Sequence, residues 1–437
     1  MIDFNKYVLL VFFSLICGCN VAAQEVLTLE TAIKSALENN FEIKISKNDL
    51  EINKVNVAAG NAGMLPKITA NIVDNNSIQN TTQTRSDGTV TKLDNAKNNS
   101  FVYGVGLDWT IFDGFKMFVK LDQLKVLEKA GQAKLKQTII TKISDVTSTY
   151  YSLVQQQQQL AALDSTLIIS RQRVTLAQNR FTIGKASKLE VLNAQVDLNA
   201  DTTALLQQKE QFANTKTVLN QIVARDLTID FLVNKDIAID EKLSLPTLIA
   251  LAEKQNPQLE VQIINKKIAE LQLKQIKADR YPTIRVNSAY NFSQSEASLG
   301  FITQSSARGL NYGFTASLNL FDGFAQQRNE KMAALQVANS KIAIEQQSQL
   351  LKATLTTSFQ TYVTNLELTK LEQKNEAIAK QNLQITLDKF RIGTITTLEF
   401  RAAQLNYINA KVRNSNAQFQ AKLSEISLKE LAGNLNF

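Results

Sequence analysis

The sequence predicts a mainly α-helical protein with a small antiparallel β part, built as two copies of one unit. Three observations support this prediction. The 437 residues include only 15 Gly and 4 Pro, too few for several globular domains joined by loops. The motif FDGF stands at residues 112–115 and again at residues 321–324, an offset of 209. Ahead of each motif, a short segment alternates apolar and polar residues with a period of two.

The first residues predict export from the cytoplasm. A basic residue precedes an apolar run and then a stretch of small residues, which is the pattern of a signal peptide over residues 1–23. Two processing routes remain open. The small residues before Gln24 favour cleavage after Ala23, whereas a lipoprotein-like motif would leave Cys19 as an acylated N-terminus.

The composition excludes most catalytic and metal sites. The only cysteines, Cys17 and Cys19, lie in the signal segment, and the chain has no histidine. The mature body therefore lacks disulfides, the usual zinc ligands and His- or Cys-based catalysis. We predict that the protein is not an enzyme and needs no cofactor or metal. The net charge of +8 comes from Lys and Arg scattered among Glu and Gln, which predicts solvated helix faces and no nucleic-acid partner.

The internal repeat extends well beyond the FDGF motif. The same offset of 209 lays residues 180–190 over residues 389–399, without an insertion. Upstream, Pro66 matches Pro282 at an offset of 216, so the segment between the proline and FDGF is seven residues longer in the first copy. Length changes of this kind belong in loops. Two long copies predict a duplicated supersecondary unit with internal pseudo-symmetry.

Each copy is expected to open with a helix. We place the first repeat at residues 24–236 and the second at residues 237–437. Thr28 and Ser244 are suitable N-caps for these opening helices. Helix is then expected to run to about Ala59 in the first copy and to about Asp279 in the second.

The segment between each proline and FDGF predicts β-strands. Residues 102–111 and 311–320 each alternate apolar residues with Gly and polar residues. About ten such residues suit a membrane-spanning antiparallel strand, and equally a half-buried strand of a soluble sheet. The polar segments 74–100 and 293–309 have the composition of long outward-facing loops, which favours the membrane reading.

The number of strands predicts assembly. After the signal, no stretch approaches the roughly twenty apolar residues of a membrane helix, so any membrane crossing must use strands. Each copy supplies two strands, whereas the smallest membrane β-barrels use about eight. The chain is therefore expected to contribute four strands to a transmembrane β-barrel shared between chains.

A long coiled-coil helix is expected after each FDGF. Residues 115–180 contain no Pro and one internal Gly, and such a length at about 1.5 Å per residue gives a rod of roughly 100 Å. Apolar residues recur there in steps of three and four, which is typical of a coiled-coil seam. The seam comprises Leu135, Ile139, Ile143, Val146, Tyr150, Leu153, Leu160, Leu163 and Leu167.

Both rods are expected to turn at a Gly and to restart with a capping box. The boxes lie at residues 187–190 and 396–399. In such a box the first hydroxyl accepts a hydrogen bond from the N3 amide, and the Glu reaches back to the cap amide. This structural role is favoured for Glu190 and Glu399. A second role remains open, because a partner can dock at an exposed hairpin tip.

Taken together, two copies of helix, β-hairpin, long helix, helical hairpin and helix resemble the TolC-like outer-membrane efflux protein family. The resemblance covers nearly the whole mature chain. It rests on Pro66 and Pro282, on the two FDGF turns, and on the paired motifs RF-x-x-G-x-x-S and KF-x-x-G-x-x-T. It implies a homotrimer whose twelve strands form one outer-membrane β-barrel, continued by a helical α-barrel in the periplasm.

The resemblance also implies a function. Members serve as the exit duct of a tripartite efflux pump or type I secretion system, through which small molecules or polypeptides leave the periplasm. The implied partners are a periplasmic adaptor, an inner-membrane pump or transporter, and outer-membrane lipid. Carried over by position, the adaptor-facing tips comprise Arg180, Phe181, Gly184, Ser187, Glu190, Lys389, Phe390, Gly393, Thr396 and Glu399.

The gate departs from the pattern of the family. Some members narrow the tunnel with acidic side chains and hold it shut with an Arg–Asp pair. Glu190 and Glu399 keep the acidic positions and are the candidate tunnel constriction, but Ile395 stands where the Arg would be and Ala402 at a second acidic position. We therefore expect a looser or differently held gate. The alternative function, a periplasmic adaptor or structural coiled-coil protein of the envelope, explains the rods but not the paired strands.

Overall fold

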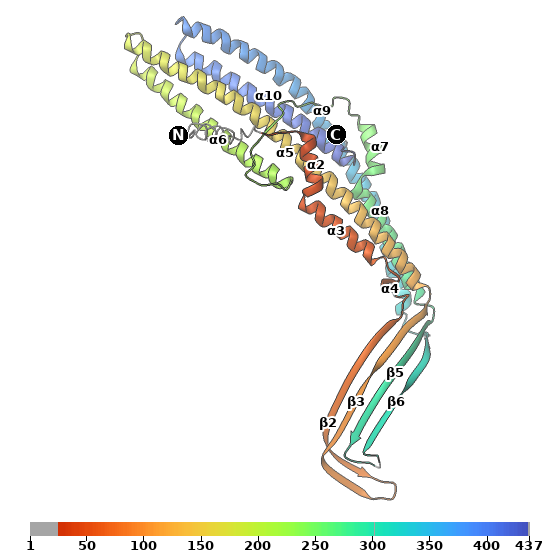
Figure 1. The fold of residues 1–437 in the computed structure, drawn as a ribbon. Coiled ribbons are helices and arrows are strands. Elements are labelled where there is room, and N and C mark those ends of the chain that lie inside the picture. The colour runs from red at the N-terminus through yellow and green to blue at the C-terminus, as the bar shows by residue number, and fades with distance from the viewer. Residues whose placement is uncertain (1–24, 301, 436–437) are drawn as a thin grey trace, which may run out of the picture. The chain divides into compact units, whose positions relative to one another are not determined.

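The computed structural model describes residues 25–300 and 302–435, so the signal segment and Cys19 lie outside the described residues. Figure 1 shows long helices and a sheet of long strands, which confirms the predicted fold class. The elements of the first half are β1 (Glu25–Leu27), α2 (Leu29–Asn39), α3 (Phe41–Asn56), α4 (Ala59–Ala62), β2 (Lys67–Thr84), β3 (Val90–Asp113), α5 (Lys116–Thr182) and α6 (Lys188–Ile222). They are followed by β4 (Phe231–Val233), α7 (Leu245–Gln255), α8 (Pro257–Ala278), β5 (Thr283–Ala297), β6 (Gln304–Ser317), α9 (Ala325–Arg391) and α10 (Thr397–Leu431).

The chain divides into two compact units. Among the described residues, the tip unit comprises residues 25–46, 135–257 and 348–435. The sheet unit comprises Lys47–Lys134 and Gln258–Gln347. The expected repeat boundary after residue 236 falls in the segment that joins β4 to α7. It stays a prediction.

The long helices confirm the predicted rods. α5 and α9 each have 67 residues, and α6 and α10 each have 35. Each FDGF motif is the turn between a strand and a rod, with its Gly at a φ of 68° or 65°. The Asp of each motif caps the rod that follows: Asp113 accepts a hydrogen bond from the Met117 amide at 3.2 Å, and Asp322 accepts one from the Gln326 amide at 2.8 Å.

The prediction of one unbroken opening helix per copy is wrong. The first helix breaks at Asn40 and its counterpart breaks at Asn256, both buried. The side-chain amide of Asn40 donates a hydrogen bond to the backbone carbonyl of Ile222 at 2.8 Å, and the side-chain amide of Asn256 donates one to the carbonyl of Leu431 at 2.9 Å. Each Asn thus satisfies a carbonyl at the end of the last helix of its own copy, which an unbroken helix would leave orphaned.

The expected helix caps are confirmed for one copy. Thr28 forms a side-chain cap with Thr31 at the start of α2. Ser244 occupies the N-cap position of α7 but makes no side-chain cap bond. The sequence therefore predicted the N-cap position in both copies, but the side-chain hydrogen bond of the cap forms only in the first.

The four long strands form one antiparallel sheet in the order β2-β3-β5-β6. Residues directly opposite one another lie on the same face, so the register separates an apolar face from a polar one. Ile72, Tyr103 and Phe292 stand in one row of the apolar face. Asn71, Gly104 and Asn291 stand in the neighbouring row of the polar face. The predicted alternation is confirmed.

The prediction of long loops is wrong. β2 and β3 continue through the polar segment and leave a turn at residues 85–89, and β5 and β6 leave only residues 298–303. In the first turn Gly88 has a φ of 82°. The Asp87 carboxylate accepts a hydrogen bond from the Thr89 backbone amide at 2.9 Å. The dipeptide Asp-Gly is typical of a tight hairpin turn. The polar residues on either side of this turn therefore belong to exposed strands and not to a long loop. The predicted strand over residues 311–320 also ends early, because β6 stops at Ser317.

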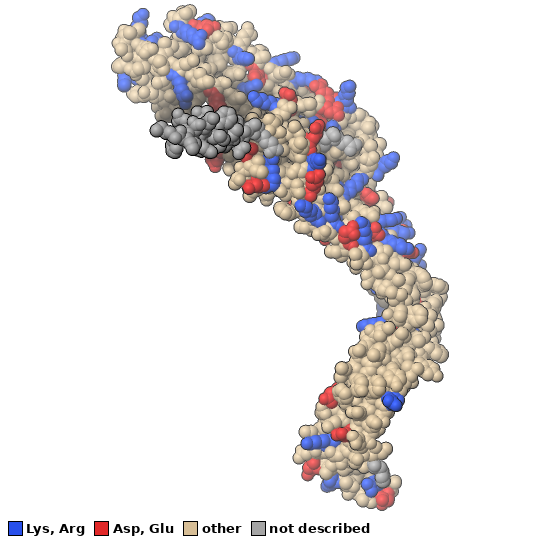
Figure 2. All heavy atoms as spheres, viewed as in Figure 1, with Lys and Arg blue, Asp and Glu red and all other residues tan. Residues whose placement is uncertain are grey.

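The main core lies in the tip unit around α5. Tyr150 donates a hydrogen bond to the carbonyl of Leu27 at 3.2 Å, and β1 pairs in parallel with β4. Both short strands contribute to one hydrophobic cluster with Val146 and Phe231. No helix among the described residues is both long enough and apolar enough to cross a membrane. Figure 2 shows charged side chains gathered over the helices and few of them across the middle of the sheet.

Candidate functional site

The two helical hairpins, α5 with α6 and α9 with α10, end in the same turn. Gly184 has a φ of 72° and Gly393 a φ of 78°, a conformation that suits glycine. In each turn the glycine amide bonds to the carbonyl three residues back, and the next amide reaches the carbonyl five residues back. This pair of bonds is a Schellman motif, and it satisfies the last carbonyls of the rod.

The restart of the return helix differs between the copies. Thr396 and Glu399 form the full predicted capping box: the Glu399 amide donates to the Thr396 hydroxyl at 3.2 Å, and the Thr396 amide donates to the Glu399 carboxylate at 2.8 Å. That amide bond to Thr396 lowers the pKa of Glu399. The prediction for this copy is confirmed.

In the first copy the glutamate does not reach back to its cap. The Glu190 amide bonds to the Ser187 hydroxyl at 3.4 Å, but the carboxylate accepts from Arg180 at 3.3 Å and from the Thr397 hydroxyl at 2.8 Å. The predicted complete box at Ser187 is therefore wrong. Because Thr397 belongs to α10, Glu190 links one hairpin to the other.

A larger link between the hairpins lies deeper along the helices. We call it the charge cluster; it consists of Arg173 on α5, Asp197 and Asp201 on α6, and Arg401 on α10. The Arg401 guanidinium donates two bonds of 2.8 Å to the Asp201 carboxylate and lies 3.6 Å from the Asp197 carboxylate. Arg173 forms an ion pair with Asp197 from the other side.

The charge cluster is mostly removed from water. The side chains of Arg173, Asp201 and Arg401 are 1%, 8% and 12% exposed. Burial acts to lower the pKa of Arg401, but its hydrogen bond to Asp201 and the nearby carboxylate charges outweigh that effect and raise it. Two positive and two negative groups balance, so the cluster carries no net charge.

Neutral side chains complete the cluster. Ser170 donates to Asp201 at 2.5 Å, and the buried Gln404 donates to Ser170 at 2.9 Å and accepts from Arg401 at 3.1 Å. Within the described part of the chain, the Nε and Nη1 atoms of Arg173 have no hydrogen-bond partner. Such a cluster is costly to form and more costly to break on one side.

Sequence reasoning missed the charge cluster, although the internal repeat contained a signal for it. The offset of 209 lays Arg401 over Leu192 and Asp201 over Ala410. When a charged residue in one copy stands where the other copy has an apolar residue, its ion pair has no equivalent in the other copy. Such a difference can therefore indicate a contact that is specific to one copy. As the sequence indicated, Ile395 cannot supply the Arg of the family's Arg–Asp pair, and a buried Arg–Asp pair lies at Arg401 instead.

The predicted tip residues are not equivalent in the two copies. Phe181 is 38% exposed, with the Lys188 ammonium 5.5 Å from the centre of its ring. Phe390 is only 2% exposed and stacks on Phe400 at 4.9 Å. Phe390 therefore supports its hairpin from inside, whereas Phe181 is available to a partner.

A groove of about 920 Å³ separates the two tips. Its lining combines the polar groups Glu190, Asp197 and Arg401 with exposed apolar side chains. Leu189, Val196 and Leu398, all in that lining, are 64%, 66% and 80% exposed. Apolar side chains gathered at the end of a rod indicate a protein-binding surface.

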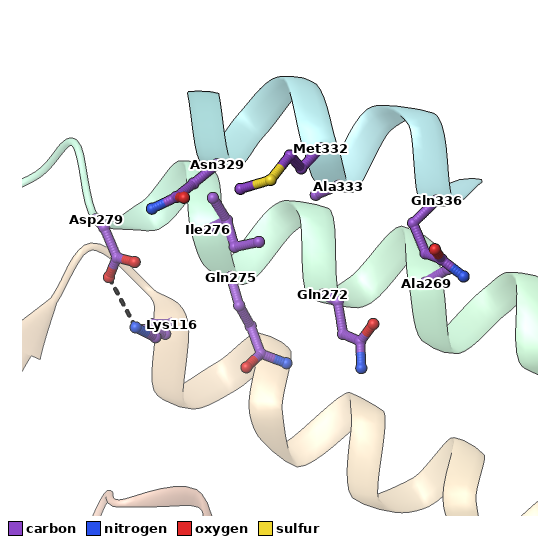
Figure 3. A pocket seen from close by; sticks show the side chains of 10 residues that line it. All are labelled: Lys116, Ala269, Gln272, Gln275, Ile276, Asp279, Asn329, Met332, Ala333 and Gln336. Carbon is purple, nitrogen blue, oxygen red and sulfur yellow. Dashed lines mark hydrogen bonds and ion pairs between the residues drawn. The ribbon is translucent and has the colours of Figure 1, made fainter. Parts of the chain in front are cut away.

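The sheet unit contains an open groove of about 520 Å³ between α8 and α9 (Figure 3). Gln272, Gln275 and Gln336 line it with Met332, and Lys116 pairs with Asp279 at one end at 2.7 Å. Amides, aliphatic groups and one satisfied ion pair suit a contact surface. Among the described residues, no group of three or more His, Cys, Asp or Glu side chains is placed to hold a metal ion.

Comparison with known proteins gives a consistent result. The family model described as outer membrane efflux protein matches residues 32–225 and 248–434. The protease secretion protein PrtF of Dickeya chrysanthemi is 18% identical over 433 residues, which is 98% of this chain and 92% of PrtF. TolC of Escherichia coli is 21% identical over 268 residues, 59% of this chain and 54% of TolC. The CmeC outer membrane channel of Campylobacter jejuni has a TM-score of 0.75 at 16% identity, over 93% of this chain and 85% of CmeC.

Proposed function

The chain belongs to the outer membrane efflux protein family, and from this premise we propose that three copies close into one conduit whose helical tips receive a periplasmic adaptor. The chain is an outer-membrane channel subunit, with its helical part in the periplasm. It serves as an exit duct of an efflux pump or a secretion system. The number of copies, the docking residues and the gate are the new elements of the proposal.

The sheet supports assembly most directly. In the described part of the chain, β2 and β6 each have one neighbouring strand, so both edges of the sheet are open. A long open edge invites pairing with another chain. Four strands are half of what the smallest closed membrane sheets use, and three copies would supply about twelve.

Within the described residues, α3, which leads to β2 through α4, and α9, which follows β6, also expose apolar side chains on one side. On α3, Ile45 and Ile52 are each 59% exposed, and on α9, Leu335 and Ile342 are 57% and 60% exposed. Each pair is seven residues apart, the spacing of a coiled-coil seam. These stripes would be buried by the next copy.

The tips suit an adaptor because apolar and charged groups meet there. Leu189, Val196 and Leu398 offer apolar contact area, and Phe181 stands exposed beside Lys188. Carried over from the family, the remaining tip positions would surround this contact: Arg180, Gly184, Ser187, Glu190, Lys389, Gly393, Thr396 and Glu399. Buried Phe390 would act through the shape of its hairpin.

The gate would be held by the charge cluster and by Glu190. Both join α6 to α10, so the two hairpins of one chain move together while these bonds persist. Opening would require Arg401 to leave Asp201, which a docked adaptor can favour by binding the separated hairpins more tightly. We further propose that the chain catalyses no reaction, since histidine is missing and both cysteines precede residue 24.

The size of the purified protein in detergent tests the assembly. We expect a particle of three chains that inserts into planar bilayers as single conducting units. A stable monomer with its full strand content would contradict the proposal. A protein that stays soluble and monodisperse without detergent would instead support the adaptor or scaffold reading.

A further inference from the structure

We propose that Lys67, Asp108 and Arg285 form one charged level on the polar face of the sheet, and that this level favours the passage of anionic solutes. The inference rests on the proposed assembly, in which the apolar face meets lipid and the polar face lines the water-filled interior. It adds a set of specificity-determining residues to a wall that is otherwise neutral. All three residues belong to the sheet unit.

The strand register assigns these three residues to the polar face. Lys67 stands opposite Asp108, and Asp108 stands opposite Asn287. Arg285 stands opposite Thr110, two positions from Asn287 on the same strand, so its side chain lies on the same face one row away. Diagonal neighbours of this kind are about 7–8 Å apart. The three charges therefore occupy two adjacent rows, at the end of the sheet where β3 leads into α5.

The rest of the polar face is neutral from these rows toward the hairpin turns. Its positions are alternate residues of 69–77, 98–106, 287–297 and 305–313, and they are Asn, Ser, Thr, Gly, Ala and Val. The other charged residues of these paired segments lie on the apolar face: Asp74, Lys97, Glu296 and Arg308. Short neutral side chains do not distinguish solutes by charge. A charged solute therefore meets its strongest interaction with the sheet at the charged level.

A further carboxylate at this end of the polar face is already bonded. Asp113 stands opposite Thr283 and accepts a hydrogen bond from the Met117 amide at 3.2 Å, at the start of α5. The positive end of the helix dipole offsets the charge of this carboxylate. Lys67, Asp108 and Arg285, by contrast, are exposed and form no ion pair with any described residue. Two cations and one anion remain, so each chain presents an excess of positive charge to the interior.

This excess of positive charge determines the kind of solute that the level favours. Rings of Arg and Lys in pores select anions, and the proposed assembly repeats the charged level in every copy around one interior. Carboxylate and phosphate groups fit best, because a guanidinium binds them through two parallel hydrogen bonds. The sign is opposite to that of Glu190 and Glu399. The selectivity of the whole channel is then the balance between two charged regions.

Ion selectivity in planar bilayers tests the charged level. Arg285→Gln and Lys67→Gln should each lower the permeability ratio of chloride to potassium, by roughly twofold in about 0.01 M salt, where the Debye length is about 30 Å. Asp108→Asn should raise the same ratio, because it removes the only free anion of the level. Arg285→Lys keeps the positive charge and should give a ratio close to that of the unmodified protein.

Arg308→Gln is the matched control, because Arg308 lies on the apolar face of the same sheet, opposite Phe292. It removes the same charge and should leave the permeability ratio unchanged. A shift as large as that of Arg285→Gln would overturn the assignment of the faces.

Two further outcomes separate this inference from the function on which it rests. If Arg285→Gln, Lys67→Gln and Asp108→Asn all form conducting trimers with the ratio of the unmodified protein, the charged level does not determine specificity and the duct stands. An unmodified protein that never forms conducting units in bilayers overturns both.

Discussion

Glu190 and Glu399 occupy equivalent positions in the two copies but bind different groups. Glu399 closes a local capping box, whose members lie within four residues, so the sequence was enough to predict it. Glu190 bonds to Thr397, 207 residues away, and no local pattern reports such a partner. The Glu190 carboxylate also forms an ion pair with Arg180, which offsets the charge of the glutamate. The Glu399 carboxylate accepts hydrogen bonds from the amide and the hydroxyl of Thr396.

Single Gln variants should separate capping from charge at the tips. Gln keeps an acceptor oxygen, so Glu399→Gln should leave the melting temperature nearly unchanged. Up to six carboxylates near one axis would favour cations, and removing the unpaired ones should reduce that preference in bilayer recordings. Glu190→Gln leaves Arg180 without its carboxylate, so it should also reduce cation preference, and losing this partly exposed ion pair should cost at most about 1 kcal/mol of stability.

The double Gln variant completes this comparison. We expect it to lose most of its cation preference, and the loss should shrink at high salt, where charges are screened. Unchanged selectivity in the double variant would leave both residues as structural groups and place the constriction elsewhere.

At the scale of elements, periodicity predicted the rods well and the polar strands poorly. A buried helix face imposes its period on the sequence, so α5 was expected within two residues at each end. Beyond the apolar part of the sheet, β2 and β3 are exposed on both faces, and nothing requires their residues to alternate. The break at Asn40 was missed because its cause, the carbonyl of Ile222, is remote in sequence.

The charge cluster should control how firmly the two hairpins hold together. Arg401→Leu leaves the buried Asp201 without its partner and should lower stability by about 3 kcal/mol or more. The same variant should raise the open fraction of the channel, measured as bilayer conductance. The double variant Arg401→Leu with Asp201→Ala copies the residues of the opposite copy, Leu192 and Ala410.

This double variant should recover part of the lost stability without closing the channel again. The difference between the single and combined effects measures the coupling between the two hairpins. A closed, fully stable channel in Arg401→Leu alone would contradict a role of the cluster in the gate.

At the scale of the whole molecule, the turn of the β2–β3 hairpin and the helical tips should face opposite sides of the outer membrane. Cysteines at Asn80 or Asn98, on the strands near the hairpin turn, should react with an impermeant thiol reagent on intact cells. A cysteine at Glu190 should react only after the outer membrane is permeabilised. Equal labelling at Glu190 on intact cells would reverse the orientation.

The equal lengths of the paired rods restrict how such a protein can change during evolution. Deleting one residue from a helix rotates everything beyond that point by about 100° and shifts it by about 1.5 Å. In α5 or α9 such a deletion would move the seam, the charge cluster and the tip out of phase with three other helices. Substitutions can therefore accumulate along the rods, whereas insertions and deletions are confined to the hairpin ends and the connecting segments.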